Sequence, residues 1–327
     1  MYLIVGGSGF IGTSLCSYLS DNNKDFIILD KLKSNSFPEK TITCDIRDRD
    51  KLFGIKQNPD LLVSLAAEHR DDVKPRSLYD EVNIGGAENL CEFSERKKIN
   101  KIIFTSSVAV YGFAEPGTNE NGKINPFNDY GRTKYAAELI YRKWQMKDPA
   151  NRTLVIIRPT VVFGEKNRGN VYNLLKQISI NRFLMIGDGS NKKSMAYVEN
   201  VASFINYCSR LDTGIHLYNY IDKPDYDMNH LVRLVRKKLG MKDTVGARIP
   251  YSLGLLGGYI CDLVSFLIRK PLSISSIRIK KFCKNTVFEA GIEETGFIPP
   301  VNLSDALEQT INYEFIEDNE GEVFYTE

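Results

Sequence analysis

The first half of the chain alternates short apolar runs with longer stretches in which apolar and polar positions recur at helical spacing. The apolar runs predict strands at residues 2–5, 26–29, 61–65, 102–105 and 154–157. The amphipathic stretches between them predict helices at residues 11–20, 78–95 and 130–144. Strands that are apolar on both faces and separated by crossover helices are typical of parallel sheets. We therefore expect an α/β fold with a doubly wound parallel sheet.

The pattern loosens after Pro159. Helices are expected at residues 171–180, 199–208 and 228–239, and a late strand at 215–220. We expect residues 1–164 to form one domain, to which the elements near 199–221 return. Residues 165–327 are expected to form mainly a smaller C-terminal lobe, which includes an apolar segment at 251–268.

Composition narrows the class of function. The chain of 327 residues has 43 basic and 41 acidic side chains, a balance that does not indicate a nucleic-acid partner. Six cysteines and three histidines are dispersed without metal-like spacing, so we expect reduced thiols and no metal site. No charged segment or cleavage site precedes the first strand, which favours a cytoplasmic protein.

A glycine-rich loop joins the first strand to the first helix. Its sequence, Gly6-Gly7-Ser8-Gly9-Phe10-Ile11-Gly12, fits both G-x-G-x-x-G and G-x-x-G-x-x-G. Absent side chains let the backbone approach a diphosphate at a helix N-terminus. Asp30 follows Gly12 by 18 residues, at the end of the second strand, where a carboxylate binds ribose hydroxyls and repels a 2′-phosphate. The pattern predicts NAD as cofactor, although Lys31 and Lys33 argue mildly for NADP.

Tyr130 and Lys134 stand one turn apart on the predicted helix 130–144, so both project from the same face. A free tyrosine has a pKa of about 10, and a nearby cation lowers it. Tyr130 is therefore a candidate proton acceptor from a substrate hydroxyl. The alternative, an ordinary amphipathic helix, is less favoured because a cofactor loop is present in the same chain.

These motifs, together with Leu65-Ala66-Ala67, Thr105-Ser106-Ser107-Val108-Ala109-Val110-Tyr111-Gly112 and Arg158-Pro159, resemble the extended short-chain dehydrogenase/reductase superfamily. The resemblance implies a Rossmann-like fold, bound NAD and the catalytic set Ser107, Tyr130 and Lys134, with Ser107 hydrogen-bonded to the reacting hydroxyl. It implies that Asp45 and Ile46 flank the adenine and that Asn83 orders the region near the active site. The cofactor-binding residues it implies are Gly6, Gly9, Phe10, Ile11, Gly12, Asp30, Asp45, Ile46, Leu65, Ala66, Ala67, Asn83, Tyr130, Lys134 and Pro159.

Within this superfamily, further blocks resemble the polyprenyl-diphosphate-linked N-acetylglucosamine 4-epimerases of bacterial O-antigen assembly. They are Ala66-Ala67-Glu68-His69-Arg70-Asp71-Asp72-Val73, Arg158-Pro159-Thr160-Val161-Val162-Phe163-Gly164-Glu165, Asn167-Arg168-Gly169-Asn170-Val171-Tyr172-Asn173 and Lys193-Ser194-Met195-Ala196-Tyr197-Val198. The resemblance implies interconversion of GlcNAc and GalNAc on diphosphate-undecaprenol, through a 4-keto sugar. The substrate contacts we expect are Ser107, Val108, Asn167, Arg168 and Asn170. For the last three, a polar loop that caps the next helix is an equal alternative.

Two departures from related enzymes bear on the reaction and the substrate. Dehydratases of this branch carry an Asp-Glu pair where Val108 and Ala109 stand here, and neither residue can act as acid or base, which disfavours dehydration. Many nucleotide-sugar enzymes have Asn at the position of Val161 and a late Arg-x-x-Asp motif, which is not evident between Ser275 and Asp305. A soluble UDP-hexose or UDP-N-acetylhexosamine 4-epimerase remains the alternative, and a non-catalytic NAD-binding sensor is an alternative of another class.

The segment 251–268 carries one charge, Asp262, and is followed by basic residues with no acid before Glu289. The basic residues are Arg269, Lys270, Arg278, Lys280, Lys281 and Lys284. Such a segment is typical of a helix that lies in a membrane interface with a basic rim toward anionic lipid, and a buried core helix is the alternative. We expect a peripheral protein on the cytoplasmic face of the bacterial inner membrane. By resemblance we also expect a homodimer formed through helices 78–95 and 130–144.

Overall fold

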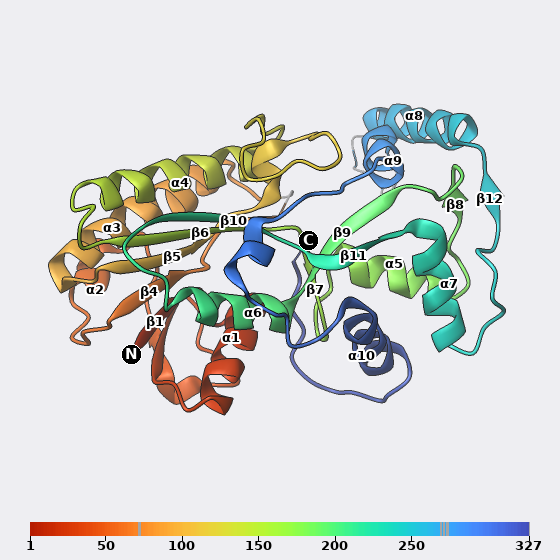
Figure 1. The fold of residues 1–327 in the computed structure, drawn as a ribbon. Helices are drawn as coiled ribbons and strands as arrows, with labels where there is room; N and C mark the ends of the chain where they lie inside the picture. The colour runs from red at the N-terminus through yellow and green to blue at the C-terminus, as the bar shows by residue number, and fades with distance from the viewer. Residues whose placement is uncertain (71–72, 269, 271, 273–274, 327) are drawn as a thin grey trace.

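The computed structural model describes residues 1–70, 73–268, 270, 272 and 275–326 (Figure 1). Asp71 and Asp72 of the first substrate-like block and Arg269 of the basic run lie outside the described residues. A large sheet with helices on both faces fills one half of the molecule, and a smaller lobe fills the other.

The large sheet has seven strands within the described part of the chain, in the order β10-β6-β5-β4-β1-β2-β3, and neighbouring strands pair in parallel. The strands are β1 (Tyr2–Val5), β2 (Phe26–Asp30), β3 (Thr41–Thr43), β4 (Leu61–Ser64), β5 (Lys101–Thr105), β6 (Thr153–Pro159) and β10 (Gly214–Tyr220). The predicted doubly wound α/β fold is confirmed. The prediction missed β3, because a strand of three residues is too short to show a strand pattern.

Helices α1 (Phe10–Asp21) and α6 (Val198–Cys208) cover one face of the large sheet. The other face is covered by α2 (Arg49–Phe53), α3 (Gly86–Lys97) and α4 (Asp129–Met146). Where one helix was expected at 78–95, a π-helical turn, η2 (Tyr79–Gly85), precedes α3. Short 3₁₀ turns lie at η1 (Pro38–Lys40), η3 (Val108–Tyr111) and η4 (Gly291–Thr295).

The smaller lobe is built on a sheet of β7 (Val161–Phe163), β9 (Lys192–Tyr197) and β11 (Asp222–Asp227), with β9 in the middle. Helices α5 (Asn170–Ser179), α7 (Met228–Lys238) and α10 (Leu303–Phe315) share an apolar core with it. A two-stranded pair, β8 (Met185–Ile186) with β12 (Arg248–Ile249), lies at its far edge. The helices expected at 171–180, 199–208 and 228–239 are confirmed to within one residue at each end.

Helix α8 (Tyr251–Ile268) lies on the outside of the small lobe, beside α9 (Ser276–Cys283) (Figure 1). By length and composition it is apolar enough to cross a membrane, and only 11% of it is buried. Phe266 is 79% exposed and Leu267 69% exposed. The alternative of a buried core helix is therefore wrong.

Gly254, Gly258 and the single acid of α8, Asp262, lie where the helix contacts the rest of the protein. A Cβ at Gly254 would lie 2.5 Å from Ile186 of β8, so the helix contacts the lobe there. Asp262 accepts a hydrogen bond from Ser276 N at the start of α9, at 3.2 Å. Gly254 and Asp262 thus attach α8 to the protein.

Candidate active site

The glycine loop brings three segments of backbone into direct contact at the carboxyl end of β1. A Cβ at Gly12 would lie 2.4 Å from Gly6 O, and one at Gly6 would lie 2.5 Å from Ala66 N. Gly6 also has a φ of +82°, which strains other residues. Among the described residues no side chain caps the N-terminus of α1 at Gly9. The loop thus leaves backbone N–H groups and a helix N-terminus to receive an anion.

Asp30 is held in place beside this loop. Its Oδ2 accepts from Ser8 N at 3.0 Å and its Oδ1 from Leu32 N at 3.0 Å. The neighbouring Lys31 forms an ion pair with Glu68 at 3.0 Å. Because Lys31 is paired and the carboxylate of Asp30 stands at the loop, the site fits a free ribose better than a 2′-phosphate.

The expected adenine-side residues lie beyond β3 and against η2 and α3. The carboxylate of Asp45 accepts from Arg47, with Nη2 to Oδ2 at 2.7 Å, and this hydrogen bond lowers the pKa of Asp45 although burial opposes it. Ile46 is buried, and a Cβ at Gly86 would lie 2.3 Å from its Cδ1. Both residues closely follow β3, at the same carboxyl edge of the parallel sheet as the glycine loop.

Asn83 is a positioning residue rather than an open donor. Its Oδ1 accepts from Glu68 N at 2.8 Å, and its Nδ2 donates to Thr133 Oγ1 at 2.9 Å. It therefore ties the segment after β4 to α4, one residue before Lys134. Leu65, Ala66 and Ala67 lie at the end of β4 beside the glycine loop. Pro159 ends β6 at the same sheet edge.

Ser107, Tyr130 and Lys134 meet where β5 ends. Ser107 caps η3, and its Oγ accepts from Ala109 N at 3.1 Å. Tyr130 is hydrogen-bonded with Ser107. Lys134 is 3% exposed, donates from Nζ to Thr105 O at 2.6 Å and lies 6.0 Å from the centre of the Tyr130 ring. The structure thus brings together a hydroxyl, a phenol and an amine as the sequence predicted.

The expected lowering of the pKa of Tyr130 is not what the structure gives. Burial raises the pKa of Tyr130 above its usual value, and the hydrogen bond with Ser107 lowers it only in part. Burial also lowers the pKa of Lys134 to about 7, against the opposing effect of Glu138. Its ammonium group faces Thr105 O, so it does not offset the desolvation of the phenol.

A buried polar network beneath this site was missed in the sequence. Glu138 accepts from Ser106 Oγ at 2.5 Å and from Arg158 Nη2 at 2.5 Å. Arg158 also donates to Tyr111 Oη at 2.7 Å, and Tyr111 donates to Asn219 Oδ1 at 2.8 Å. The signal was present, because Tyr130, Lys134 and Glu138 are spaced four residues apart on one helix face.

The expected substrate residues after β7 have partners within the protein. Arg168 Nη1 forms an ion pair with Glu314 Oε2 at 2.5 Å, and its guanidinium stacks over Tyr172 at 4.1 Å. Asn167 is buried and accepts from Thr326 Oγ1 at 2.7 Å. Asn170 opens α5. These contacts match the alternative of a polar loop before a helix, and contact of Asn167 or Arg168 with substrate stays a prediction.

The C-terminal tail contacts the Asn167 side chain and the Arg168 backbone. Phe324 O accepts from Arg168 N at 2.7 Å, and the Phe324 ring packs 5.9 Å from the ring of Phe10 at the start of α1. Glu322 accepts from Asn35 in the loop after β2, at 2.8 Å. The tail therefore runs beside the glycine loop and joins the two lobes.

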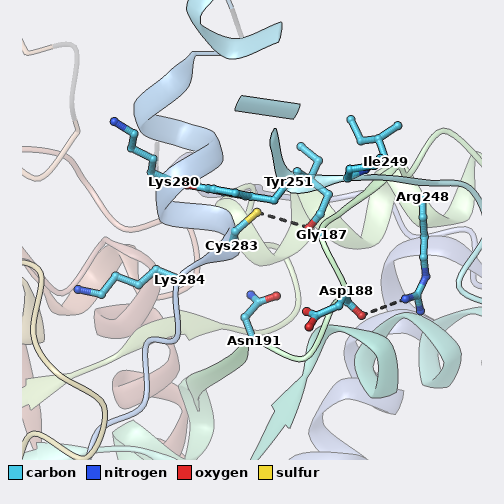
Figure 2. Close-up of a pocket in the computed structure, with 11 residues that line it drawn as sticks. Gly187, Asp188, Asn191, Arg248, Ile249, Tyr251, Lys280, Cys283 and Lys284 are labelled. Atoms are coloured by element: carbon cyan, nitrogen blue, oxygen red, sulfur yellow. Dashed lines mark hydrogen bonds between the residues drawn. The ribbon is translucent and has the colours of Figure 1, made fainter. Parts of the chain in front are cut away.

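Figure 2 shows a cavity of about 860 Å³ on the small lobe, between β8, β12, the start of α8 and α9. Apolar side chains of Ile186, Ile249 and Tyr251 line it together with Lys280, Cys283 and Lys284. Its lining residues are far from Ser107, Tyr130 and Lys134 in the sequence, and none of them belongs to the expected cofactor site.

Comparison with known proteins gives the family. The pattern of the NAD dependent epimerase/dehydratase family matches residues 2–219, and the chain belongs to this family. The chain is similar to the N-acetyl-alpha-D-glucosaminyl-diphospho-ditrans,octacis-undecaprenol 4-epimerase of Escherichia coli O157:H7, with 46% identity over 99% of this chain and 98% of that protein.

Solved structures agree with the fold. A UDP-glucose 4-epimerase of Thermotoga maritima, solved with UDP-glucose, has a TM-score of 0.75 at 20% identity and covers 95% of this chain and 97% of its own. A UDP-glucose 4-epimerase of Thermus thermophilus, solved with NAD, has a TM-score of 0.71 at 18% identity, with 95% and 98% covered. The glycine loop, Asp30 and the open N-terminus of α1 fit the NAD that the family binds.

Proposed function

We propose that this protein is an NAD-dependent 4-epimerase that interconverts GlcNAc and GalNAc on a diphosphate-undecaprenol carrier, for surface polysaccharide assembly. The observation that carries the proposal is 46% identity, over essentially the whole chain, to an enzyme named for that substrate. An exposed apolar helix beside a cationic cavity supports a lipid-linked substrate over a water-soluble one.

Each catalytic side chain has a place in this reaction. The backbone of the glycine loop and Asp30 would hold NAD, which would supply the hydride acceptor for oxidation at C4 and the hydride donor for return to the opposite face of the sugar. Tyr130 takes the proton of the C4 hydroxyl and gives it back, while Ser107 hydrogen-bonds the same oxygen. We assign Lys134 to the cofactor ribose, because its buried amine lies in the same site, 6.0 Å from the centre of the Tyr130 ring. Val108 and Ala109 add no acid or base, so the sugar keeps its C6 hydroxyl.

We also propose that α8 rests on the cytoplasmic face of the inner membrane. Its outward residues are apolar along the whole helix, and they include Leu253, Leu256, Ile260, Leu263, Phe266 and Leu267. Lys280 and Arg278 on the adjacent α9 are exposed. An apolar helix with a basic rim is the composition that binds anionic lipid surfaces. Binding to vesicles of zwitterionic lipid with and without anionic lipid tests this, and equal absence from both would contradict it.

A homodimer through α3 and α4 is the assembly we propose. The outer side of α4 exposes Leu139 at 41% and Met146 at 68%. Light scattering of the purified protein measures the mass directly, and Met146→Glu should shift a dimer toward monomer.

The decisive experiment offers the purified protein and NAD two substrates in parallel, GlcNAc-diphosphate-polyprenol in detergent and UDP-GlcNAc. GalNAc is detected by lectin or borate separation, and Tyr130→Phe serves as the inactive control. Turnover of the lipid-linked sugar by wild type supports the proposal. Turnover of UDP-GlcNAc alone overturns it in favour of a soluble nucleotide-sugar epimerase, and turnover of neither favours an NAD-binding sensor. Accumulation of NADH in proportion to product would instead indicate a net oxidoreductase.

A further inference from the structure

The cavity beneath α8 has two kinds of wall. Ile186 of β8, Ile249 of β12 and Tyr251 at the start of α8 contribute apolar surface. Lys280 and Lys284, on and just after α9, lie on the other side, and Figure 2 shows both extending to the same side of the helix. An apolar floor with cations along one margin suits a ligand that is apolar at one end and anionic at the other.

The other polar groups of the cavity have partners within the protein. Arg248 donates to Asp188 O at 3.0 Å and to Asn229 Oδ1 at 2.6 Å. Asp188 Oδ1 accepts from Ser190 N at 3.0 Å, and Asn191 Nδ2 donates to Phe282 O at 2.8 Å. These groups are therefore committed to the loop that shapes the cavity. Lys284 Nζ donates to Phe113 O and Lys280 Nζ lies 5.3 Å from the centre of the Tyr259 ring, so both ammonium groups have contacts at the margin of the cavity and keep further N–H donors for a ligand.

The cationic margin connects to the active site. Lys284 Nζ donates to Phe113 O at 3.2 Å and lies 5.4 Å from the centre of the Phe113 ring, which stacks on Phe127 at 4.8 Å. Lys281 lies 4.5 Å from the centre of the Phe127 ring. Phe127 directly precedes Asn128, whose side chain caps the N-terminus of α4, the helix that carries Tyr130.

The same contacts are reinforced by backbone pairing. Gly117 N donates to Val287 O at 2.9 Å, and Glu289 N donates to Thr118 O at 3.0 Å. The segment that follows α9 is thus joined to the loop that leads into α4. A ligand held at Lys284 is oriented by the same loop that precedes the catalytic tyrosine.

The apolar side of the cavity connects to α8. Ile186 contacts α8 at Gly254, and Tyr251 belongs both to the cavity wall and to the exposed helix, where it is 42% exposed. The apolar floor is therefore continuous with the outward face of α8. Lys284 thus ties one margin of the cavity to the loop before α4, and Tyr251 joins its apolar floor to α8.

We propose that this cavity binds the diphosphate and the first isoprene units of the lipid carrier. Lys284 and Lys280 bind the diphosphate oxygens, and Ile186, Ile249 and Tyr251 contact the isoprene units, while the sugar lies toward Tyr130. The lipid chain then leaves along the underside of α8. This inference rests on the proposed function and deepens it, because it assigns the residues that distinguish a lipid handle from a nucleotide.

A chemical protection experiment tests the site without changing its walls. Cys283 and Cys261 are partly exposed, whereas Cys16, Cys44, Cys91 and Cys208 are buried. In a Cys261→Ser background a maleimide reports on Cys283, which lines the cavity. Farnesyl diphosphate should slow this alkylation about tenfold when present at ten times its dissociation constant, and UDP should not.

Protection by UDP at a similar concentration, or no protection by farnesyl diphosphate, overturns the proposal. Cys261 in a Cys283→Ser background is the matched control, because it lies on α8 and does not line the cavity. Its alkylation should be unchanged by farnesyl diphosphate in detergent.

Substitutions give a second readout. Lys284→Ala should raise KM for GlcNAc-diphosphate-polyprenol about tenfold, the cost of one charged hydrogen bond, with kcat nearly unchanged, and Lys284→Arg should restore it in part. Arg233→Ala on α7, an exposed basic residue that does not line the cavity, is the control. Ile249→Glu should raise the same KM, while Ile298→Glu, at a position 84% exposed and outside the cavity, should not.

The cavity assignment and the proposed 4-epimerase function are contradicted by different results. If wild type converts the lipid-linked sugar but neither the protection nor the KM effects appear, the cavity assignment is wrong and the epimerase proposal stands. If only UDP-GlcNAc is converted, the proposed function itself is wrong.

Discussion

Gly258 of α8 rests directly on the backbone of Ser276 of α9. A Cβ at Gly258 would lie 2.8 Å from Ser276 Cα and 3.0 Å from Ser276 N, distances that real Cβ atoms do not accommodate without a shift. One turn earlier Gly254 contacts β8, and one turn later Asp262 receives the N–H of Ser276. The helix is therefore attached along one narrow face, and its apolar remainder is left outside.

Gly258→Ala should loosen α8, because the new methyl group meets backbone that cannot rotate away. We expect a loss of about 1–3 kcal/mol in the local stability of the α8–α9 pair. Gly257→Ala is the matched control, since nothing lies within 4 Å of a Cβ there, and it should be neutral or slightly stabilising. Hydrogen exchange of α8 amides measures both. Equal protection in the two variants would show that α8 does not pack on α9 in this way.

The buried amine of Lys134 predicts a specific pH dependence of stability. Burial lowers the pKa of Lys134 to about 7, whereas an unfolded lysine keeps its proton to about pH 10.4. Between these values the unfolded state binds more protons, so this group makes the free energy of unfolding rise with pH. Below pH 7 Lys134 is charged in the folded state as well, and the free energy of unfolding is lowered by the full cost of burying that charge.

Lys134→Met removes that contribution. For the cofactor-free protein, the free energy of unfolding of wild type minus that of the variant should increase from pH 7 to pH 9.5, by up to about 1.4 kcal/mol per pH unit. Urea denaturation at several pH values measures the difference, and the range ends before tyrosines titrate. Parallel curves for the two proteins would contradict the lowered pKa.

The ion pair of Glu138 with Arg158 should be essential to folding of the active-site floor. Both side chains are almost fully buried, at 0% and 3% exposed, and the guanidinium also holds Tyr111. Glu138→Gln leaves the Arg158 charge without its carboxylate and should cost about 3–5 kcal/mol in the free energy of unfolding. The double variant Glu138→Gln/Arg158→Met should recover part of that loss. If Glu138→Gln unfolds at the same urea concentration as wild type, the ion pair does not stabilise the active-site floor in this way.

The C-terminal tail should slow the release of NAD. Phe324 packs on Phe10, the first residue of the helix whose N-terminus faces the cofactor loop. Phe324→Ala should therefore speed dissociation of NAD and make the tail easier to cleave by protease. Tyr325→Ala is the control, because Tyr325 is 66% exposed. NAD remaining after gel filtration measures retention, and equal loss from both variants would argue against a role of the tail.

Local sequence was sufficient for the elements of the cofactor site. The strands at 2–5, 26–29 and 61–65 and the glycine loop were found because each has a period or a glycine spacing that only a few conformations satisfy. Their assembly at one sheet edge then followed, because parallel strands with crossover helices end at the same edge. Ser107, Tyr130 and Lys134 come together for the same reason.

Side-chain partners were not predictable in this way. Glu314 and Thr326, which engage Arg168 and Asn167, are more than a hundred residues away in the chain. The pKa of Tyr130 depends on how much water reaches the phenol, which no spacing records, and so the expected lowering was wrong. Charge type alone therefore gave neither the partners of Asn167 and Arg168 nor the direction in which the pKa of Tyr130 is shifted.

The sequence by itself determined the doubly wound sheet and the NAD loop, because these depend on periodicity and on residues close to one another along the chain. Its resemblance to the extended short-chain dehydrogenase/reductase superfamily implied the catalytic set. Only the tertiary structure decided whether segment 251–268 is core or surface. Its apolar composition fits a core helix and a surface helix equally well. The surface position results from the contacts of Gly254, Gly258 and Asp262 with β8 and α9. Whether a helix is buried depends on the elements that pack against it, and these cannot be read from the sequence of the helix alone.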